Sequence, residues 1–482
     1  MKTLLKYFVI VSLLLTFVSM IALSSDELDR TTRPAPKPAP TVTLPQIQKA
    51  TLSNGLQVWL VERHQLPTFA FNLVIQAGSD HDPANMPGLA SMTASVLDEG
   101  TSTREALALA DEIETMGAQL NANAGVDGSS VSLSSLSINL DQAISVFSDV
   151  VTNPSFPQKE FDRLKRQRLT DLIRQKDQPP AIANNAFSFL LYGAGHPYGN
   201  NASGTEASIN AMTRDDIVKF YQTYYVPNNA TLIAVGDLKM SDIVAKLEAG
   251  LKNWAKKDVP PLTLASPPPI DKMRIYLIDK PGAAQSEIRV GFPALSRSTP
   301  DYFAASEMNR MLGGQFSSRI NLNLREKHGY TYGARSGFSF YKNPGPFIAS
   351  APVVTNKSDS SLSELLYEIK LMHDKGMTDD ELKFVKDGLM GGFALSFETP
   401  GQIAGALQSI VLYGLPEDYF SHYIQNIENV SLDQVQAAAH NYLDLSKMVV
   451  LVVGDLATIK SGIASLNLGD IIECDLDGKP KK

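Results

Sequence analysis

The residues of this chain best suited to chemistry are an arginine and a tyrosine seven positions apart, Arg325 and Tyr332. Both lie in the glycine-rich stretch 313–332, GGQFSSRINLNLREKHGYTY. An arginine fork can hold a carbonyl or carboxylate group, and a tyrosine hydroxyl can donate a hydrogen bond to a developing oxyanion. Taken alone, the two residues favour a plainer interpretation, in which they belong to a solvated helix end and the strand after it.

A second stretch, residues 88–101 (GLASMTASVLDEGT), has the spacing of a short helix. Leu89, Met92 and Val96 recur on one side of it, which predicts a buried face. Ser91 and Ser95 are one turn apart, but no adjacent histidine or lysine is present to activate either hydroxyl. We therefore interpret both serines as small polar packing residues.

The histidine pattern gives little support to a metal site. Catalytic zinc usually takes two of its ligands three or four residues apart on one helical face. The chain has 7 histidines, and even the two nearest in sequence, His64 and His81, are too far apart for such a pair, so only a site built from scattered ligands stays open. His196 precedes Pro197 in a glycine-rich loop, which is typical of a turn residue rather than a functional group.

The elements that must position these residues repeat along the chain. Val-Gly-Asp-Leu occurs twice, with Gly236 in the first copy and Gly454 in the second. Leu60 and Leu277, in the two opening apolar strands, are separated by the same interval to within a single position. A constant offset across several elements predicts two homologous α+β halves.

Composition limits the domains and the partners. A chain of 482 residues calls for two or more domains, and a net charge of −8 argues against nucleic acid as the main partner. Lys2 and Lys6 flank an apolar run, which predicts a signal peptide or an uncleaved anchor and thus a periplasmic or membrane-anchored protein. The predicted segments are a signal peptide or anchor (1–24), a proline-rich tether (25–46), a first half (47–258), a proline-rich linker (259–271), a second half (272–470) and a C-terminal tail (471–482).

Cys474 is the only cysteine of the chain, so an exported protein of this sequence would hold no internal disulfide. Its stability would then depend on burial of the core. The position of Cys474 near the C-terminus predicts a solvent-near thiol rather than a nucleophile.

Over about residues 45–465 the chain resembles the pitrilysin/insulinase-type metallopeptidases, which include the mitochondrial processing peptidase and bacterial peptidases of similar half size. The resemblance is carried by LSNGLQVWLVE, GLASMTASVLDEGT, HPYGNNASGT, FYQTYYVPNNATLIAVGDL and above all GGQFSSRINLNLREKHGYTYGARSGF. It implies two α/β-sandwich halves, each an antiparallel-rich sheet covered by helices. The long glycine-rich loop of the mitochondrial α subunit is missing, so presequence recognition is not implied.

The resemblance also shows what this chain lacks. The family's H-x-x-E-H motif falls on Ser91, Ala94 and Ser95, so both histidine ligands and the general base are absent. The family's third ligand, a glutamate, falls on Asp171, and a single carboxylate cannot hold zinc at useful affinity. We therefore expect no metal and no other cofactor in this chain, and zinc in a partner subunit.

Arg325 and Tyr332 match, at the right spacing, the pair with which catalytic members of the family reach the substrate. The resemblance thus implies a non-catalytic subunit of an exported heterodimeric zinc metallopeptidase, with a homologous zinc-bearing partner and a peptide substrate. A structural or peptide-binding pseudoenzyme is the alternative, and a homodimer in place of the heterodimer also stays open. Independent catalysis would need the lost ligands.

Overall fold

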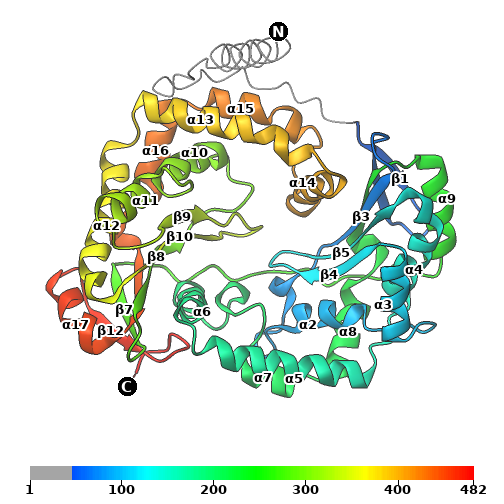
Figure 1. Cartoon of the computed structure of the whole chain (residues 1–482), viewed down its shortest axis with the longest axis horizontal. Helices are drawn as coiled ribbons and strands as arrows, with labels where there is room; N and C mark the ends of the chain where they lie inside the picture. Colours follow the sequence, from blue (N-terminus) through cyan, green and yellow to red (C-terminus); the bar gives the residue numbers. More distant parts are fainter. Residues whose placement is uncertain (1–45, 482) are drawn as a thin grey trace, which may run out of the picture. The chain divides into compact units, whose positions relative to one another are not determined.

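The computed structural model describes residues 46–481, and the predicted signal peptide and nearly all of the predicted tether lie outside this range. Two six-stranded sheets organise the described chain, with strand orders β1-β2-β6-β3-β5-β4 and β12-β7-β11-β8-β10-β9 (Figure 1). The strands of the first sheet are β1 (Gln48–Thr51), β2 (Gln57–Glu62), β3 (Thr68–Ile75), β4 (Gln119–Ala124), β5 (Ser129–Leu136) and β6 (Ala230–Gly236). Those of the second are β7 (Arg274–Asp279), β8 (Gln285–Pro293), β9 (Arg335–Phe338), β10 (Pro346–Val354), β11 (Val449–Gly454) and β12 (Ile471–Cys474).

Five strands of each sheet correspond and confirm the predicted repeat. In both sheets one parallel pair, β2 with β6 and β7 with β11, is followed by antiparallel strands in the same order. The sixth strand differs. β1 comes from before the first repeat and pairs antiparallel with β2, whereas β12 follows the second repeat and pairs parallel with β7. The fold is therefore two homologous α+β halves, and our residue limits for the segments remain predictions.

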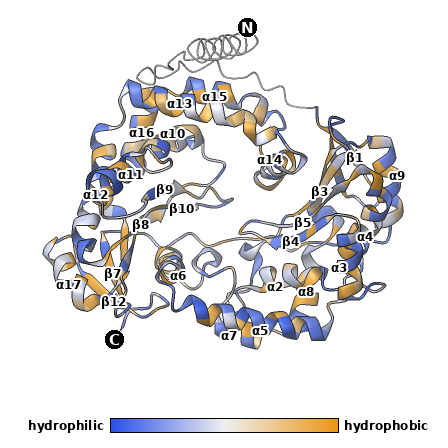
Figure 2. Ribbon diagram, in the orientation of Figure 1, coloured by the Kyte–Doolittle hydropathy of each residue, from blue (hydrophilic) through white to orange (hydrophobic). Residues whose placement is uncertain are grey.

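Helices cover one face of each sheet with side chains of the same half. In the first half these helices are α2 (Leu89–Leu97), α3 (Ala106–Thr115), α4 (Leu140–Thr152), α5 (Gln158–Gln175), α7 (Glu206–Ala211), α8 (Arg214–Tyr224) and α9 (Met240–Leu251). In the second half they are α10 (Tyr302–Leu312), α11 (Arg319–Asn321), α12 (Ser358–Lys375), α13 (Asp379–Phe393), α16 (Leu432–Tyr442) and α17 (Leu456–Ser465). The short helix α15 (Tyr423–Asn429) packs on α10 and α13. Surface helices such as α5 are mostly hydrophilic, and inner strands such as β7 are mostly hydrophobic (Figure 2).

The other face of each sheet is covered by a helix from the opposite half. Helix α6 (Pro179–Tyr192) packs on β8 and β11, and α14 (Pro400–Tyr413) packs on β3 and β6. Polar pairs fix both contacts: the guanidinium of Arg289 donates to Asn184 Oδ1 at 3.1 and 3.2 Å, and Asn72 Nδ2 donates to Gln408 Oε1 at 2.7 Å. Both faces of the inner strands are thus buried, which explains why β11 is a continuous apolar run and why β3 is apolar on both sides apart from Thr68 and Asn72. Neither half completes its own core.

The prediction that the thiol of Cys474 lies near solvent is wrong. The residue ends β12, which pairs with β7, and its side chain is fully buried beside the strands that α6 covers. Burial raises the pKa of the thiol to about 11, so the thiolate needed for nucleophilic chemistry is disfavoured. This strand was missed because the expected tail began at residue 471. Within residues 46–481 no helix is both long and apolar enough to cross a membrane.

An isolated carboxylate lies in the core of the second half. Glu307 on α10 is 0% exposed, and within the described chain neither carboxylate oxygen has a hydrogen-bond partner. Burial raises its pKa to about 8, and the charge of Lys386 offsets only part of the shift. Glu307 is therefore protonated and neutral at pH 7 in the folded protein.

This buried acid predicts a falling stability toward alkaline pH. In the unfolded chain Glu307 ionises near its ordinary pKa of 4.5, whereas folding holds the proton until about 8. The protonated form favours the fold fully below the lower pKa, and that contribution is lost as pH rises through the upper one. Between pH 5 and 8 the native chain should therefore lose unfolding free energy relative to Glu307→Gln, which has no carboxyl group at this position. We expect the difference between the two to change by on the order of a few kcal/mol over this range.

Urea unfolding at a series of pH values measures this gain. Glu114→Gln, on the exposed side of α3, is the matched control and should keep the pH slope of the native chain. Parallel pH profiles for Glu307→Gln and the native chain would contradict the neutral state of Glu307.

Candidate functional site

The helix expected to carry the zinc motif, α2, begins in a tightly shaped turn. Gly88 precedes it with φ of +93°, and a Cβ on Gly88 would meet the backbone of Gly204 at 2.7 Å. Asp82 caps the first turn, because its carboxylate accepts the N–H groups of Gly88 and Ala90, both at 2.7 Å. Burial raises the pKa of Asp82 to about 7, against those hydrogen bonds. The frame of a catalytic helix is therefore kept.

The positions that would bind zinc in this frame hold hydroxyls and a methyl group. Ser95 Oγ donates to the carbonyl of Ser91 at 2.9 Å, which satisfies it within the helix, and the methyl group of Ala94 is buried. The carboxylate of Asp171 on α5 is turned to another partner, Arg174, at 2.6 Å. Hydroxyls and a paired surface carboxylate are poor zinc ligands compared with imidazole and thiolate. The residues present do not fit zinc.

A cation of the protein itself stands between these positions. Arg168 on α5 donates from Nη1 to Ser91 Oγ at 3.1 Å and to the carbonyl of Ser203 at 3.1 Å, and from Nη2 to Ser95 Oγ at 3.3 Å. Its guanidinium therefore binds both hydroxyls that replace the histidines. Within residues 46–481 no group of three or more His, Cys, Asp or Glu side chains is placed to hold a metal ion.

The second predicted site centres on Arg325. This residue lies in a single π-helical turn, Leu322–Lys327, of the kind often found at functional positions. Its guanidinium lies over the ring of Phe316 at 4.6 Å and approaches Glu326 at 3.5 Å. Nη1 is shielded from solvent and has no hydrogen-bond partner in the described chain. A guanidinium held on a ring face with a free N–H is suited to bind a carbonyl oxygen.

The loop after this turn carries Tyr332 and is fixed by its backbone. Gly329 has φ of +65°, and the Tyr330 N–H donates to the Leu324 carbonyl at 2.8 Å, so the chain folds back on the turn of Arg325. Thr331 Oγ1 then accepts the Gly333 N–H at 3.0 Å. Tyr332 itself is 90% exposed. A rigid loop presents an aromatic side chain to solvent, and no hydrogen bond joins it to Arg325 in the described chain.

A layer of polar groups lies behind this loop. Asn323 Nδ2 donates to Glu364 Oε2 at 2.9 Å and to Glu368 Oε1 at 2.6 Å, which ties the π-helical turn to α12. His328 stacks on Tyr330 with ring centroids 4.9 Å apart. Sequence reasoning singled out none of these residues, although His328 and Tyr330 lie inside the motif. They are buried or half-buried, and they support the turn of Arg325 and the start of the loop that carries Tyr332.

Comparison with known proteins places both sites in one family. Residues 57–193 match the family described as Insulinase (Peptidase family M16), and residues 211–389 match the one described as Peptidase M16 inactive domain. The solved structure of a peptidase M16 inactive domain from Pseudomonas fluorescens is 30% identical, with a TM-score of 0.80 over 85% of this chain and 98% of that one. The chain belongs to the M16 peptidase family. The resemblance predicted from the motifs is thus confirmed.

Other M16 relatives differ in what their names say. A protein of Helicobacter pylori named a non-peptidase homolog is 26% identical over 82% of this chain and 90% of its own length. An uncharacterized zinc protease of Mycobacterium leprae is 25% identical over 86% of this chain and 93% of its own length. Because this M16 chain matches an inactive-domain description and lacks fitting zinc ligands, we place it with the inactive members of the family.

The motif His196-Pro197-Tyr198-Gly199 is structural in this M16 chain. His196 is buried, its Nδ1 accepts the Tyr198 N–H at 3.0 Å, and burial lowers its pKa, so the ring is neutral. The Tyr198 hydroxyl donates to Asp127 Oδ1 at 2.7 Å, and Asp127 also accepts the Lys342 N–H at 2.9 Å. Because Lys342 belongs to the second half, the motif links the two repeats. The interpretation of His196 as a turn residue is in keeping with this geometry.

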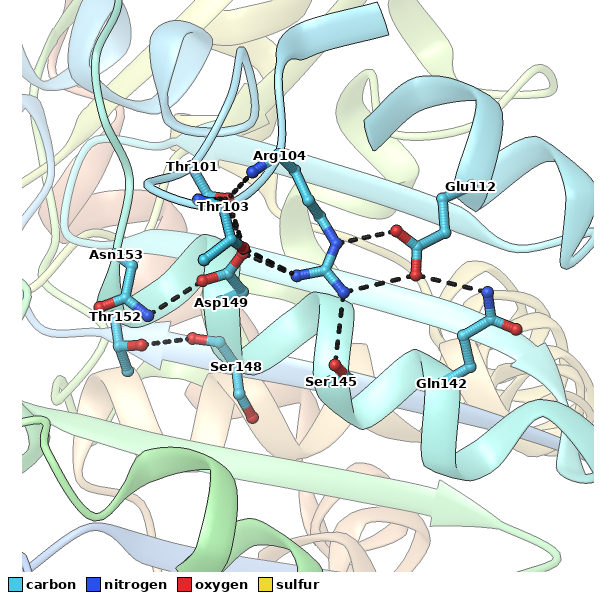
Figure 3. Close-up of polar contacts among 10 residues, drawn as sticks. All are labelled: Thr101, Thr103, Arg104, Glu112, Gln142, Ser145, Ser148, Asp149, Thr152 and Asn153. Atoms are coloured by element: carbon cyan, nitrogen blue, oxygen red, sulfur yellow. Dashed lines mark hydrogen bonds and ion pairs between the residues drawn. The ribbon is translucent and has the colours of Figure 1, made fainter. Parts of the chain in front are cut away.

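A polar network that the sequence did not reveal begins at Thr101, shortly after α2 (Figure 3). Asp149 on α4 accepts hydrogen bonds from Thr101 at 2.5 Å, from Thr103 at 2.7 Å and from Arg104 at 2.7 Å, and Arg104 also donates to Glu112 at 2.8 Å. Burial opposes ionisation of Asp149, yet these donors hold its pKa below the ordinary value. A pocket of about 480 Å³ lies beside the network, but its charged groups are already paired. We assign the network to stability.

Removing the charge of Asp149 tests that assignment. Asp149→Asn leaves Arg104 with one carboxylate instead of two and replaces an acceptor by a donor toward two threonines. Loss of one partner of a mostly buried ion pair costs about 3–5 kcal/mol, and partial exposure of this pair brings the expected loss to roughly 2–3 kcal/mol.

Chemical unfolding of the purified chain at pH 7 measures the loss. Asp141→Asn on the same helix is the matched control, because Asp141 is 81% exposed and its pair with Lys246 is screened by water. Equal losses in the two variants would contradict a structural role of the buried network.

Proposed function

We propose that this chain is the non-catalytic subunit of a heterodimeric zinc metallopeptidase. In this proposal a homologous partner holds the zinc ion, and this chain contributes Arg325 and Tyr332 to the peptide bound beside it. The supporting observation is the exposure of Tyr332: a fixed loop holds 90% of an aromatic side chain in water, which has no evident use within the chain itself. An exported, periplasmic or membrane-anchored location belongs to the same proposal.

The two side chains would act on one carbonyl group. The guanidinium of Arg325, whose side chain is 34% exposed, would hold the carbonyl of the bond to be cut, and the Tyr332 hydroxyl would donate to the oxygen as negative charge develops on it. Zinc bound by the partner would supply an activated water molecule. This chain therefore binds and orients, and its own residues carry no proton in the reaction.

One sheet edge could hold the rest of the peptide. β4 ends the first sheet, so it has backbone groups that no neighbouring strand uses, whereas on the end strand β9 the N–H and the carbonyl of Ser336 are already bonded to Gly313 and Asn309. Along β4 the side chains of Gln119, Asn121 and Asn123 are exposed in alternation, so this edge is polar and open. An extended peptide can add to such an edge as a further strand, with backbone hydrogen bonds that do not depend on its sequence. The proposed substrate is thus an extended peptide segment.

The second candidate is a pseudoenzyme that binds peptide or builds an assembly without any proteolytic partner. The name of the Helicobacter pylori relative, a non-peptidase homolog, favours it, as does the lack of fitting zinc ligands. In that case Arg325 and Tyr332 would hold a peptide carbonyl or carboxylate without any reaction. The presence of an M16 partner with intact H-x-x-E-H residues distinguishes the two candidates.

The deciding experiment purifies the tagged full-length chain from its own host after cross-linking and identifies bound M16 chains by mass spectrometry. Each chain and the pair are then assayed for zinc by elemental analysis and for hydrolysis of a mixed peptide library. We expect one zinc per pair and hydrolysis by the pair alone. An inert pair, or no homologous partner, would favour the pseudoenzyme. Stoichiometric zinc and hydrolysis in this chain alone would refute both candidates.

A further inference from the structure

The guanidinium of Arg168 joins three separate parts of the first half. It reaches from α5 to Ser91 and Ser95 on α2 and to the carbonyl of Ser203 in the turn before α7. That turn is itself fixed, because Asn201 Oδ1 accepts the Ser203 N–H at 2.9 Å and the Gly204 N–H donates to the Asn201 carbonyl at 2.8 Å. One side chain therefore connects α2 and α5, the two helices that hold the former ligand positions, and also the turn that contains Ser203.

The charge of Arg168 has no carboxylate of its own. Within residues 46–481 it forms no ion pair, and the nearest acidic group to influence it, Asp171, is bound to Arg174. Arg104 in the same half contrasts with it, since two carboxylates neutralise Arg104. Burial accordingly lowers the pKa of Arg168. An arginine side chain nevertheless keeps its proton in a folded protein, so a positive charge persists among the former ligand positions, where two hydroxyl oxygens and one carbonyl oxygen accept its hydrogen bonds.

We propose that Arg168 is the resident cation of the degenerate zinc site, and that it both fastens α2, α5 and the 201–204 turn and bars a divalent metal ion. In this proposal the chain differs from a zinc-binding member in two ways. It lacks the metal ligands, and it holds a fixed positive charge that repels a metal ion from the same space. This proposal concerns the isolated chain and does not rest on a partner subunit or on Arg325 and Tyr332.

Restoring the ligands with and without Arg168 tests the barrier. The four-fold variant Ser91→His, Ala94→Glu, Ser95→His, Asp171→Glu carries the full ligand set, and a five-fold variant adds Arg168→Ala. We expect zinc alone to bind the five-fold variant at least about 100-fold more tightly, because like charges a few ångströms apart repel strongly when partly buried. Competition with a chromogenic chelator gives the affinities, and elemental analysis gives the stoichiometry.

The control replaces an exposed arginine of the same helix. Arg166→Ala added to the four-fold variant removes a charge of the same sign two residues away, outside the site, and should leave zinc binding as weak as before. Equal zinc affinities of the four-fold and five-fold variants, whether both tight or both undetectable, would overturn the barrier. Equal gains from Arg166→Ala and Arg168→Ala would overturn it too, because net charge would then explain the effect.

The fastening role is tested in the otherwise native chain, so it stands apart from the folding of the multiple variants. Arg168→Ala should speed amide hydrogen exchange in α2 and in residues 201–204, while Arg166→Ala should leave both segments unchanged. Unchanged exchange in Arg168→Ala would overturn this role. Circular dichroism melts of every variant show whether the chain compared is folded.

Discussion

A peptidase pair that contains Arg325→Ala or Tyr332→Phe should turn over peptide about 10²–10³-fold more slowly than the native pair, as is usual for loss of one oxyanion donor. The reason lies in where the two groups stand. Arg325 keeps a free N–H against the ring of Phe316, and the Tyr332 hydroxyl projects from a fixed loop. Tyr332→Phe removes an exposed hydroxyl, and Arg325→Ala removes a side chain whose ring contact, Phe316, is itself 69% exposed, so each variant should still fold and assemble with the partner.

Steady-state kinetics of the reconstituted pair measure the effect, and size-exclusion chromatography checks assembly. Arg166→Ala and Tyr367→Phe are the matched controls, because Arg166 is exposed on α5 and Tyr367 is 55% exposed on α12, outside the π-helical turn and its loop. Both controls should keep native kcat and KM. Native turnover by the Arg325 and Tyr332 variants would contradict the proposal that these two residues act on the peptide bound beside the partner's zinc ion.

Phe187→Ala should destabilise the chain by about 3–5 kcal/mol, the usual cost of deleting a buried phenylalanine ring. Phe187 is 1% exposed on α6, and its cluster contains Leu451 and Val453 of the second sheet. The substitution lies in the first half, yet the cavity would open against the sheet of the second. Loss of this contact should therefore weaken both halves together.

Urea unfolding with one spectroscopic probe in each half measures both effects. Phe384→Ala on α13 is the control, because that ring is 39% exposed and its loss should cost only roughly 1–2 kcal/mol. Two separate transitions in Phe187→Ala, with the second half unaffected, would show that the exchanged helix does not couple the cores.

The repeat made the fold predictable, and the exchange of helices did not. The matching Val-Gly-Asp-Leu strands and the constant offset sufficed for two α+β halves, and the short helix predicted within residues 88–101 is α2. Helices α6 and α14 were missed. Each begins with proline, and each carries apolar residues on most of its sides, so the sequence shows no contrast between an apolar stripe and a polar face.

The site was predictable where its residues belong to a motif and obscure where they do not. Ser91, Ala94 and Ser95 came from alignment with the frame of α2, and the structure finds the serines together on one face. Arg168 is one of several basic residues on a mostly polar helix, and nothing in its spacing distinguishes it from Arg166. Only the folded chain shows which of these charges turns inward.

The exchange of α6 and α14 also bears on synthesis of the chain. The last strand of the first sheet ends at Gly236, whereas the helix that closes its second face begins at Pro400, so a large part of the second half is made between them. On a ribosome the first sheet is complete long before its cover emerges, and its bare apolar face is open to misassociation. We therefore expect the nascent chain to depend on chaperones until translation has passed α14.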